Sequence, residues 1–128
     1  MRLRVEVDGE PFAPGDTVAG RVVVEDGGRA RSLSVRLAFV ERTESFSKVA
    51  REAATEPIAD GELAAGAVFA FRLALPADAL PDVTTPQGRI GWELRARVDR
   101  AGQDPIVDRP LSMQRGYTAP DRERWPSG

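Results

Sequence analysis

A proline–glycine pair followed by a run of alternating valines is the feature that most constrains the fold of this chain. Residues 12–24 are Phe-Ala-Pro-Gly-Asp-Thr-Val-Ala-Gly-Arg-Val-Val-Val. Pro14 fixes φ near the value required at the second position of a turn, and Gly15 accepts the positive φ of the third, so the pair predicts a type II turn. Beyond the turn, alternate residues share one face: Val18, Gly20, Val22 and Val24. This period of two predicts a half-buried β-strand, in which Gly20 marks either a close approach by another backbone, a bulge, or a tolerated glycine.

Four further segments alternate in the same way and predict strands at residues 2–7, 33–39, 69–75 and 90–98, and after a turn a last strand is expected near residues 106–113. Short strands separated by turn residues, without a long amphipathic helix, indicate an all-β chain built as an immunoglobulin-like antiparallel β-sandwich. The largest inward side chains of its expected core are Phe39, Phe69, Phe71 and Trp92. We expect one sandwich domain over residues 1–114, followed by a polar tail over residues 115–128.

The connections between these strands carry their own predictions. The sequence Asp26-Gly27-Gly28-Arg29 favours a hairpin whose glycines adopt positive φ, and Pro76–Gly88 is expected to be a long loop. Val40 breaks the alternation of its strand, which indicates a bulge or twist there. Residues 43–60 combine local helix propensity with charged residues suited to an exposed edge strand, and the edge strand is the favoured interpretation.

Composition limits the chemistry available to the chain. It has no cysteine and no histidine among 128 residues, so disulfides, thiolate nucleophiles, Cys or His zinc sites and Ser-His-Asp catalysis are absent by composition. The net charge is -2, and the basic residues are spread along the strands, so we expect no nucleic-acid partner. No apolar run is long enough to span a membrane, and the first residues alternate charged with apolar side chains instead of forming an export signal, so a cytoplasmic location is expected.

Several segments, taken in order, resemble the arrestin-like amino-terminal domain. They are the Pro-Gly-Asp turn with its valine and glycine strand at residues 14–22, the Phe-rich strand ending in proline at 69–76, the Leu-Pro pair at 80–81, and the strand 89–99 that contains Trp92. The resemblance spans residues 3 to about 113. It implies an immunoglobulin-like sandwich that binds other proteins through loops, edge strands and sheet faces, without catalysis. Arrestins and the bacterial sporulation-control proteins carry two such sandwiches, whereas this sequence predicts one, so functions that depend on a groove between two domains are not carried over.

Outward-facing arginines and two aromatic residues of the tail are the candidate protein-binding residues. Five arginines occupy outward strand positions: Arg21, Arg36, Arg72, Arg95 and Arg97. If their strands are neighbours, they form one surface that grips carboxylates or phosphates, and the alternative is a solvated face balanced by acids. Tyr117 and Trp125 lie outside any alternating segment, and such aromatics either fold back onto the sandwich or anchor a partner.

Acidic residues offer weaker alternatives. Glu93, Asp99, Asp104 and Asp108 surround a predicted hairpin that is a candidate for Ca²⁺, without EF-hand spacing. Glu6 with Glu10, or Asp78 with Asp82, are conceivable acid–base pairs whose separation the sequence does not fix. We therefore expect a noncatalytic adaptor or scaffold domain, with no metal and no cofactor, that binds an unidentified protein or a second copy of itself. A small-ligand, carbohydrate or calcium-binding module is the alternative.

Overall fold

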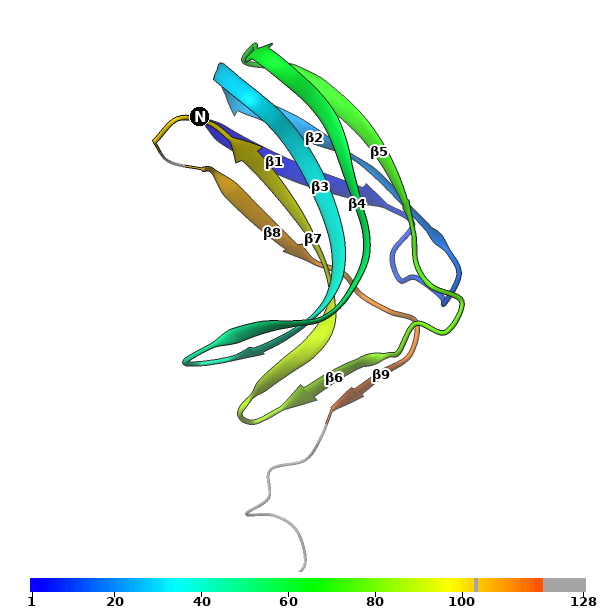
Figure 1. Ribbon diagram of the computed structural model, residues 1–128. Coiled ribbons are helices and arrows are strands. Elements are labelled where there is room, and N and C mark those ends of the chain that lie inside the picture. Colours follow the sequence, from blue (N-terminus) through cyan, green and yellow to red (C-terminus); the bar gives the residue numbers. More distant parts are fainter. Residues whose placement is uncertain (103, 119–128) are drawn as a thin grey trace, which may run out of the picture.

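The computed structural model describes residues 1–102 and 104–118, and every regular element within these ranges is a β-strand. The strands are β1 (Arg2–Asp8), β2 (Thr17–Asp26), β3 (Gly28–Thr43), β4 (Ser47–Leu63), β5 (Val68–Ala74), β6 (Asp82–Thr85), β7 (Gly88–Asp99), β8 (Ile106–Pro110) and β9 (Gly116–Thr118). They form two layers, which Figure 1 shows from the side. The predicted all-β sandwich is confirmed.

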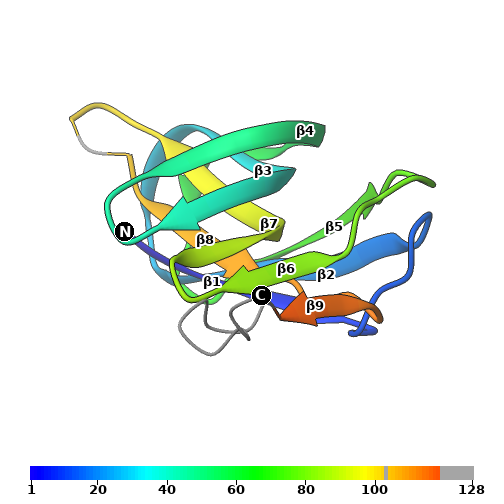
Figure 2. The ribbon, with the colours of Figure 1, turned by 90° about the horizontal axis from the view of Figure 1, so that it is seen from below.

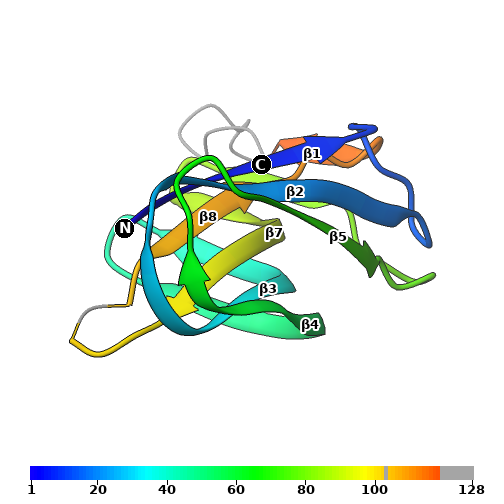
Figure 3. The ribbon, with the colours of Figure 1, turned by 90° about the horizontal axis from the view of Figure 1, so that it is seen from above.

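The smaller layer has the strand order β1-β2-β5, and the larger has the order β4-β3-β7-β6-β9, with β8 also paired to β7. Figures 2 and 3, seen from below and from above, show β1, β2 and β5 stacked across from β3, β4 and β7. All pairs are antiparallel except β6 with β9. Strand β3 pairs along one whole edge of β7. On the other edge of β7, β6 pairs with residues 88–90 and β8 pairs with residues 93–97.

The core lies between the layers and is built from the inward residues of both sheets, as the alternation predicted. Trp92 is its largest fully buried side chain. Its ring lies 5.1 Å from that of Phe39, centroid to centroid, and its Nε1–H donates to the Leu80 carbonyl at 3.0 Å. Phe71 is buried, while Phe69 is only partly buried at the margin of the core. Tyr and Trp side chains are stable in a core when the polar atom finds such a partner.

The opening turn is present. Gly15 has a φ of +84°, and the Asp16 amide donates to the Ala13 carbonyl at 3.1 Å, which closes the predicted turn. Gly20 lies where β1, β2 and β5 approach closely, because a Cβ added there would sit 2.1 Å from the Glu6 carbonyl oxygen. Of the interpretations open for Gly20, the close backbone approach is therefore the one observed.

Two predictions about the connections were wrong, and the strand expected near residues 106–113 is present but shorter than expected. Residues 26–29 form no hairpin, because β2 and β3 belong to different sheets, and neither Gly27 nor Gly28 has positive φ. Position 27 requires a glycine for another reason, because a Cβ there would lie 2.5 Å from the Leu63 carbonyl oxygen. The expected loop from Pro76 to Gly88 contains strand β6, and the strand expected over 106–113 ends at Pro110.

Residues 43–60 follow the favoured prediction, since most of them belong to β4, a long edge strand whose only strand partner among residues 1–102 and 104–118 is β3. The register of this pairing shifts at four places, including the step from Phe39 to Val40, so the irregularity expected at Val40 is confirmed. Figure 1 shows β3 and β4 bending together along their length. Residues 116–118, within the segment expected to be a tail, form β9.

Candidate functional site

The five candidate arginines do not share a surface. Arg21 and Arg72 lie on β2 and β5 of the smaller sheet, whereas the other three lie on β3 and β7 of the larger sheet. A single surface formed by all five arginines required their strands to be neighbours, and this condition is not met, because alternation tells which side chains point outward but not which sheet a strand joins.

On the smaller sheet, Arg21 is bound to acids of the neighbouring strand. Its Nε lies 2.7 Å from Glu6 Oε2, and its Nη1 lies 3.2 Å from Asp8 Oδ2. Arg72 is exposed and forms no ion pair with the described residues. This face matches the alternative of a solvated surface balanced by acids, at least at Arg21.

The larger sheet gathers the remaining three, Arg36, Arg95 and Arg97, into what we call the arginine cluster. Arg36 on β3 is the direct cross-strand partner of Arg95 on β7 and of Thr55 on β4. The cluster lines a shallow depression of about 390 Å³, whose other lining residues are Ser34, Glu52, Thr55, Asp104 and Ile106. Guanidinium groups in such a depression are suited to binding planar anions.

Acids already pair with two members of the cluster. Asp108 accepts from Arg95 Nε at 2.7 Å and Nη2 at 3.0 Å, and Asp104 accepts from Arg97 Nη2 at 2.6 Å. Burial is the largest influence on the pKa of Asp108 and raises it, but the hydrogen bonds and charge of Arg95, together with the charges of Arg42 and Arg36, outweigh burial, so this pKa lies below its ordinary value. Hydrogen bonds from Arg97 and from the Arg100 amide lower the pKa of Asp104 in the same way.

Arg36 differs from its two neighbours. It forms no ion pair with any residue in the described part of the chain, and its Nε is buried without a hydrogen-bond partner there. Buried donors in proteins are nearly always paired, because an unpaired one loses its hydration without compensation. Arg36 is therefore the member of the cluster that has no acidic partner among the described residues.

A buried ion pair that the sequence did not predict adjoins the cluster. Arg42 donates to Glu93 through Nε and Nη2, each at 2.7 Å, and its Nη2 also lies 3.2 Å from Asp108. The Glu93 side chain is only 4% exposed although it lies on the outer face of β7. Ala38 and Val40, which also point outward by alternation, are buried as well. In the sequence, this buried patch on the outer face was indicated by Val40, an apolar residue at a position where alternation predicts a polar one.

The acids considered as calcium ligands or catalytic pairs are held in ion pairs with arginines. Asp99 lies 3.9 Å from Arg31, Asp78 lies 3.1 Å from Arg51, and Asp82 lies 3.4 Å from Arg89. Glu10 bonds to Arg109 and accepts from the Ser112 amide at 2.7 Å. Burial opposes ionisation of Glu10, but these hydrogen bonds lower its pKa overall. Over residues 1–102 and 104–118 no group of three acids is placed to hold a metal ion.

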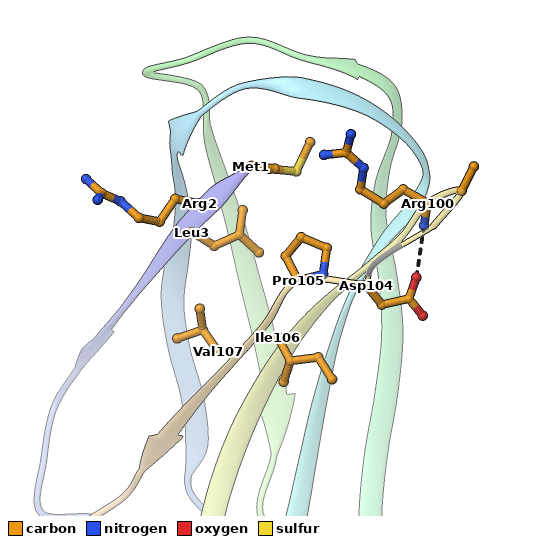
Figure 4. A pocket seen from close by; sticks show the side chains of 9 residues that line it. Met1, Arg2, Leu3, Arg100, Asp104, Pro105, Ile106 and Val107 are labelled. Carbon is orange, nitrogen blue, oxygen red and sulfur yellow. Dashed lines mark hydrogen bonds between the residues drawn. The ribbon is translucent and has the colours of Figure 1, made fainter.

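A pocket of about 560 Å³ opens between the start of β1 and the connection from β7 to β8 (Figure 4). Leu3, Pro105 and Val107 line it with apolar surface. The Arg2 side chain points away from its centre and pairs with Glu25 at 3.4 Å. In Figure 4 the Asp104 carboxylate accepts from the Arg100 amide, at 3.2 Å. No set of polar groups converges within this pocket, so we do not assign it a site.

Of the two aromatic candidates near the end of the chain, the structure describes the backbone of one. Tyr117 belongs to β9, where its backbone is paired with Val83 of β6. Trp125 lies outside the described residues. A binding role for either residue stays a prediction. Among the described residues no helix is long and apolar enough to cross a membrane.

Comparisons with known proteins find similarity in structure but not in sequence. No family model matches the chain, and no curated protein matches its sequence. The solved structure of Spo0M, a sporulation control protein from Bacillus subtilis, superimposes with a TM-score of 0.65 over 89% of this chain at 14% sequence identity. The matched region spans 49% of the Spo0M chain.

The chain has the arrestin-like fold. The resemblance noted from the Pro-Gly-Asp turn, the Phe-rich strand and the Trp92 strand is thus confirmed at the level of fold. Because the arrestin-like sandwich described here spans about half of the Spo0M chain, what the whole of Spo0M does is not transferred to it.

Proposed function

We propose that this arrestin-like sandwich is a noncatalytic, cytoplasmic adaptor domain that binds a protein partner through the outer face of its larger sheet. One observation carries the proposal: within the arginine cluster, Arg36 is half-buried and free of any ion pair with the described residues, while Arg95 and Arg97 beside it are paired. Arginine is enriched in protein interfaces, and a guanidinium with unused donors is a strong anchor there. The fold shared with a sporulation control protein supports a regulatory rather than a catalytic role.

Self-association through β4 is the second candidate. This edge strand runs over 17 residues, and pairing is found only on its β3 side. A free strand edge offers backbone donors and acceptors to an added strand. The small-ligand alternative has no comparable support, because the acids on which it depends are bound to arginines.

Affinity purification from native cell extract tests the proposal, with the full chain as bait and two variants beside it. Arg36→Gln removes the unpaired guanidinium of the larger sheet, and Arg72→Gln removes an exposed, unpaired arginine of the smaller sheet as the matched control. We expect a specific partner to be retained by the native chain and by Arg72→Gln, and lost by Arg36→Gln.

Retention of the partner by all three baits contradicts the proposed face. Light scattering on the same samples separates the second candidate, since self-association through β4 gives a mass that rises with concentration in every variant.

A further inference from the structure

The charge balance around Arg36 defines which anion fits there. Arg36, Arg95 and Arg97 face three acids on the same surface, namely Glu52, Asp104 and Asp108. The depression is thus close to neutral before any ligand binds. A group with one negative charge pairs with Arg36 at little electrostatic cost, whereas a doubly charged phosphate meets repulsion from all three carboxylates.

The hydrogen-bond donors of the arginine cluster define the shape of the anion that fits the depression. Asp108 takes Nε and Nη2 of Arg95, and Asp104 takes Nη2 of Arg97, which leaves further N–H groups of both side chains without an ion-pair partner in the described chain. The Arg36 side chain forms no ion pair with the described residues, and its Nε is buried without an acceptor, so this nitrogen meets a ligand only if the side chain shifts. Donors fixed in the plane of a guanidinium match the two oxygens of a carboxylate.

The side chains on either side of Arg36 are themselves engaged in hydrogen bonds. Thr55, its cross-strand partner on β4, donates to Glu52, so that acid is already engaged and lies beside Arg36 without forming an ion pair with it. On its other side stands Arg95, oriented by Asp108. Side chains that are already oriented lose less conformational entropy when a ligand binds.

We propose that Arg36 is the docking point for the carboxylate of an acidic protein segment, one Asp or Glu side chain of which enters the depression lined by the arginine cluster. This inference rests on the proposed function for the nature of the partner. The site itself is testable without that partner.

The test is NMR observation of the arginine Nε–Hε signals of the full ¹⁵N-labelled chain during titrations. The probes are sodium acetate, inorganic phosphate, sodium chloride at matched ionic strength, and a blocked peptide of alternating Gly and Glu. We expect the Arg36 signal, identified by its loss in Arg36→Gln, to shift saturably with acetate and with the peptide but not with chloride. The peptide should bind at least about tenfold more tightly than acetate, because any one of its carboxylates can occupy the site while the others stay outside the depression, and its flanking residues add contacts.

Variants keep the result interpretable. Arg36→Lys preserves the charge but not the planar fork, and should weaken peptide binding about tenfold while the spectrum stays dispersed. Arg72→Gln should bind the peptide as the native chain does. An Arg36 signal that does not move, or that moves equally with chloride, overturns the proposal. Tighter binding of phosphate than of acetate overturns the choice of carboxylate, and peptide binding no tighter than acetate overturns the choice of a protein segment.

Failure of this inference and failure of the proposed function give different results. A cellular partner that is lost with Arg36→Gln, combined with no response to the Gly-Glu peptide, leaves the adaptor function standing and removes the acidic segment. A saturable peptide response with no partner dependent on Arg36 leaves the carboxylate site standing and removes the adaptor function.

Discussion

The Arg42–Glu93 pair is asymmetric in burial, and this asymmetry has a measurable consequence. The Glu93 side chain is 4% exposed, while that of Arg42 is 36% exposed. Removing Arg42 leaves a buried carboxylate without its main partner, but removing Glu93 leaves an arginine that can reach water and Asp108. We predict that Arg42→Leu lowers the free energy of unfolding by about 3 kcal/mol and Glu93→Leu by roughly 1 kcal/mol.

Urea unfolding of the two single variants and of the double variant measures this difference. The double variant should be closer to Glu93→Leu than to Arg42→Leu, since it contains no unpaired buried charge. Equal destabilisation by the two single substitutions would show that burial of Glu93 does not govern the pair.

Gly20 provides a second prediction for a single residue. An added Cβ would lie 2.1 Å from the Glu6 carbonyl oxygen and 3.0 Å from the Phe71 ring, and a backbone atom cannot yield as a flexible side chain can. Gly20→Ala is expected to lower the free energy of unfolding by about 2 to 3 kcal/mol. Gly116→Ala is the control, because its nearest atom would lie 3.8 Å from the new Cβ. Thermal unfolding of both variants gives the comparison, and a Gly20→Ala protein as stable as the control would refute the close approach.

Among the elements, β4 is the edge strand at which the second candidate function places self-association, and it also carries features that limit such pairing. Pro57 removes one backbone donor, the register with β3 shifts repeatedly, and charged side chains such as Lys48 and Glu56 lie along the strand. These features protect natural sheet edges from adding a second chain. We predict that Pro57→Val tightens self-association roughly tenfold, seen by light scattering as a higher average mass at equal concentration. Lys48→Gln serves as the comparison, and an unchanged mass for Pro57→Val would mean that the proline has no protective role.

The same elements show what sequence patterns reveal and what they leave open. Alternation located the strands around Val22, Leu37 and Leu94, since each buries one face, and it identified which arginines point outward. It did not reveal that β2 and β3 belong to different sheets, because strand pairing depends on contacts between distant residues. The four residues of β6 were missed for a related reason, since this strand follows a proline and is defined by its pairing with β7 and β9. The burial of Glu93 was not predictable either, because it accompanies an ion pair with Arg42, which lies far away in the sequence.

For the whole molecule, the ion pairs predict how stability depends on pH. The pKa values of Glu10, Asp104 and Asp108 lie below their ordinary values in the folded chain. A carboxyl group with a lowered folded pKa contributes stability above its unfolded pKa, about 4, and this contribution is lost as the pH falls through the folded pKa. We therefore predict that the free energy of unfolding is constant near neutral pH and decreases as the pH falls below about 4.

Urea unfolding at pH 7, 4 and 3 measures this dependence. Asp108→Asn should be less stable than the native chain at pH 7 and should lose less stability on acidification, because one of the contributing carboxylates is gone. An equally steep decrease in the variant would exclude Asp108 as a contributor.

Strand β7 pairs with β3, β6 and β8 of the larger sheet. Because it lies late in the sequence, it is made late during translation. The pairing that sets Arg36 beside Arg95 joins β3 to a strand made only after β4, β5 and β6. Distant pairings form last, since the intervening chain must first be made and then closed. A nascent chain that has emerged only as far as β6 therefore carries Arg36 but no arginine cluster. A partner that recognises the cluster would distinguish completed sandwiches from unfinished chains on the ribosome.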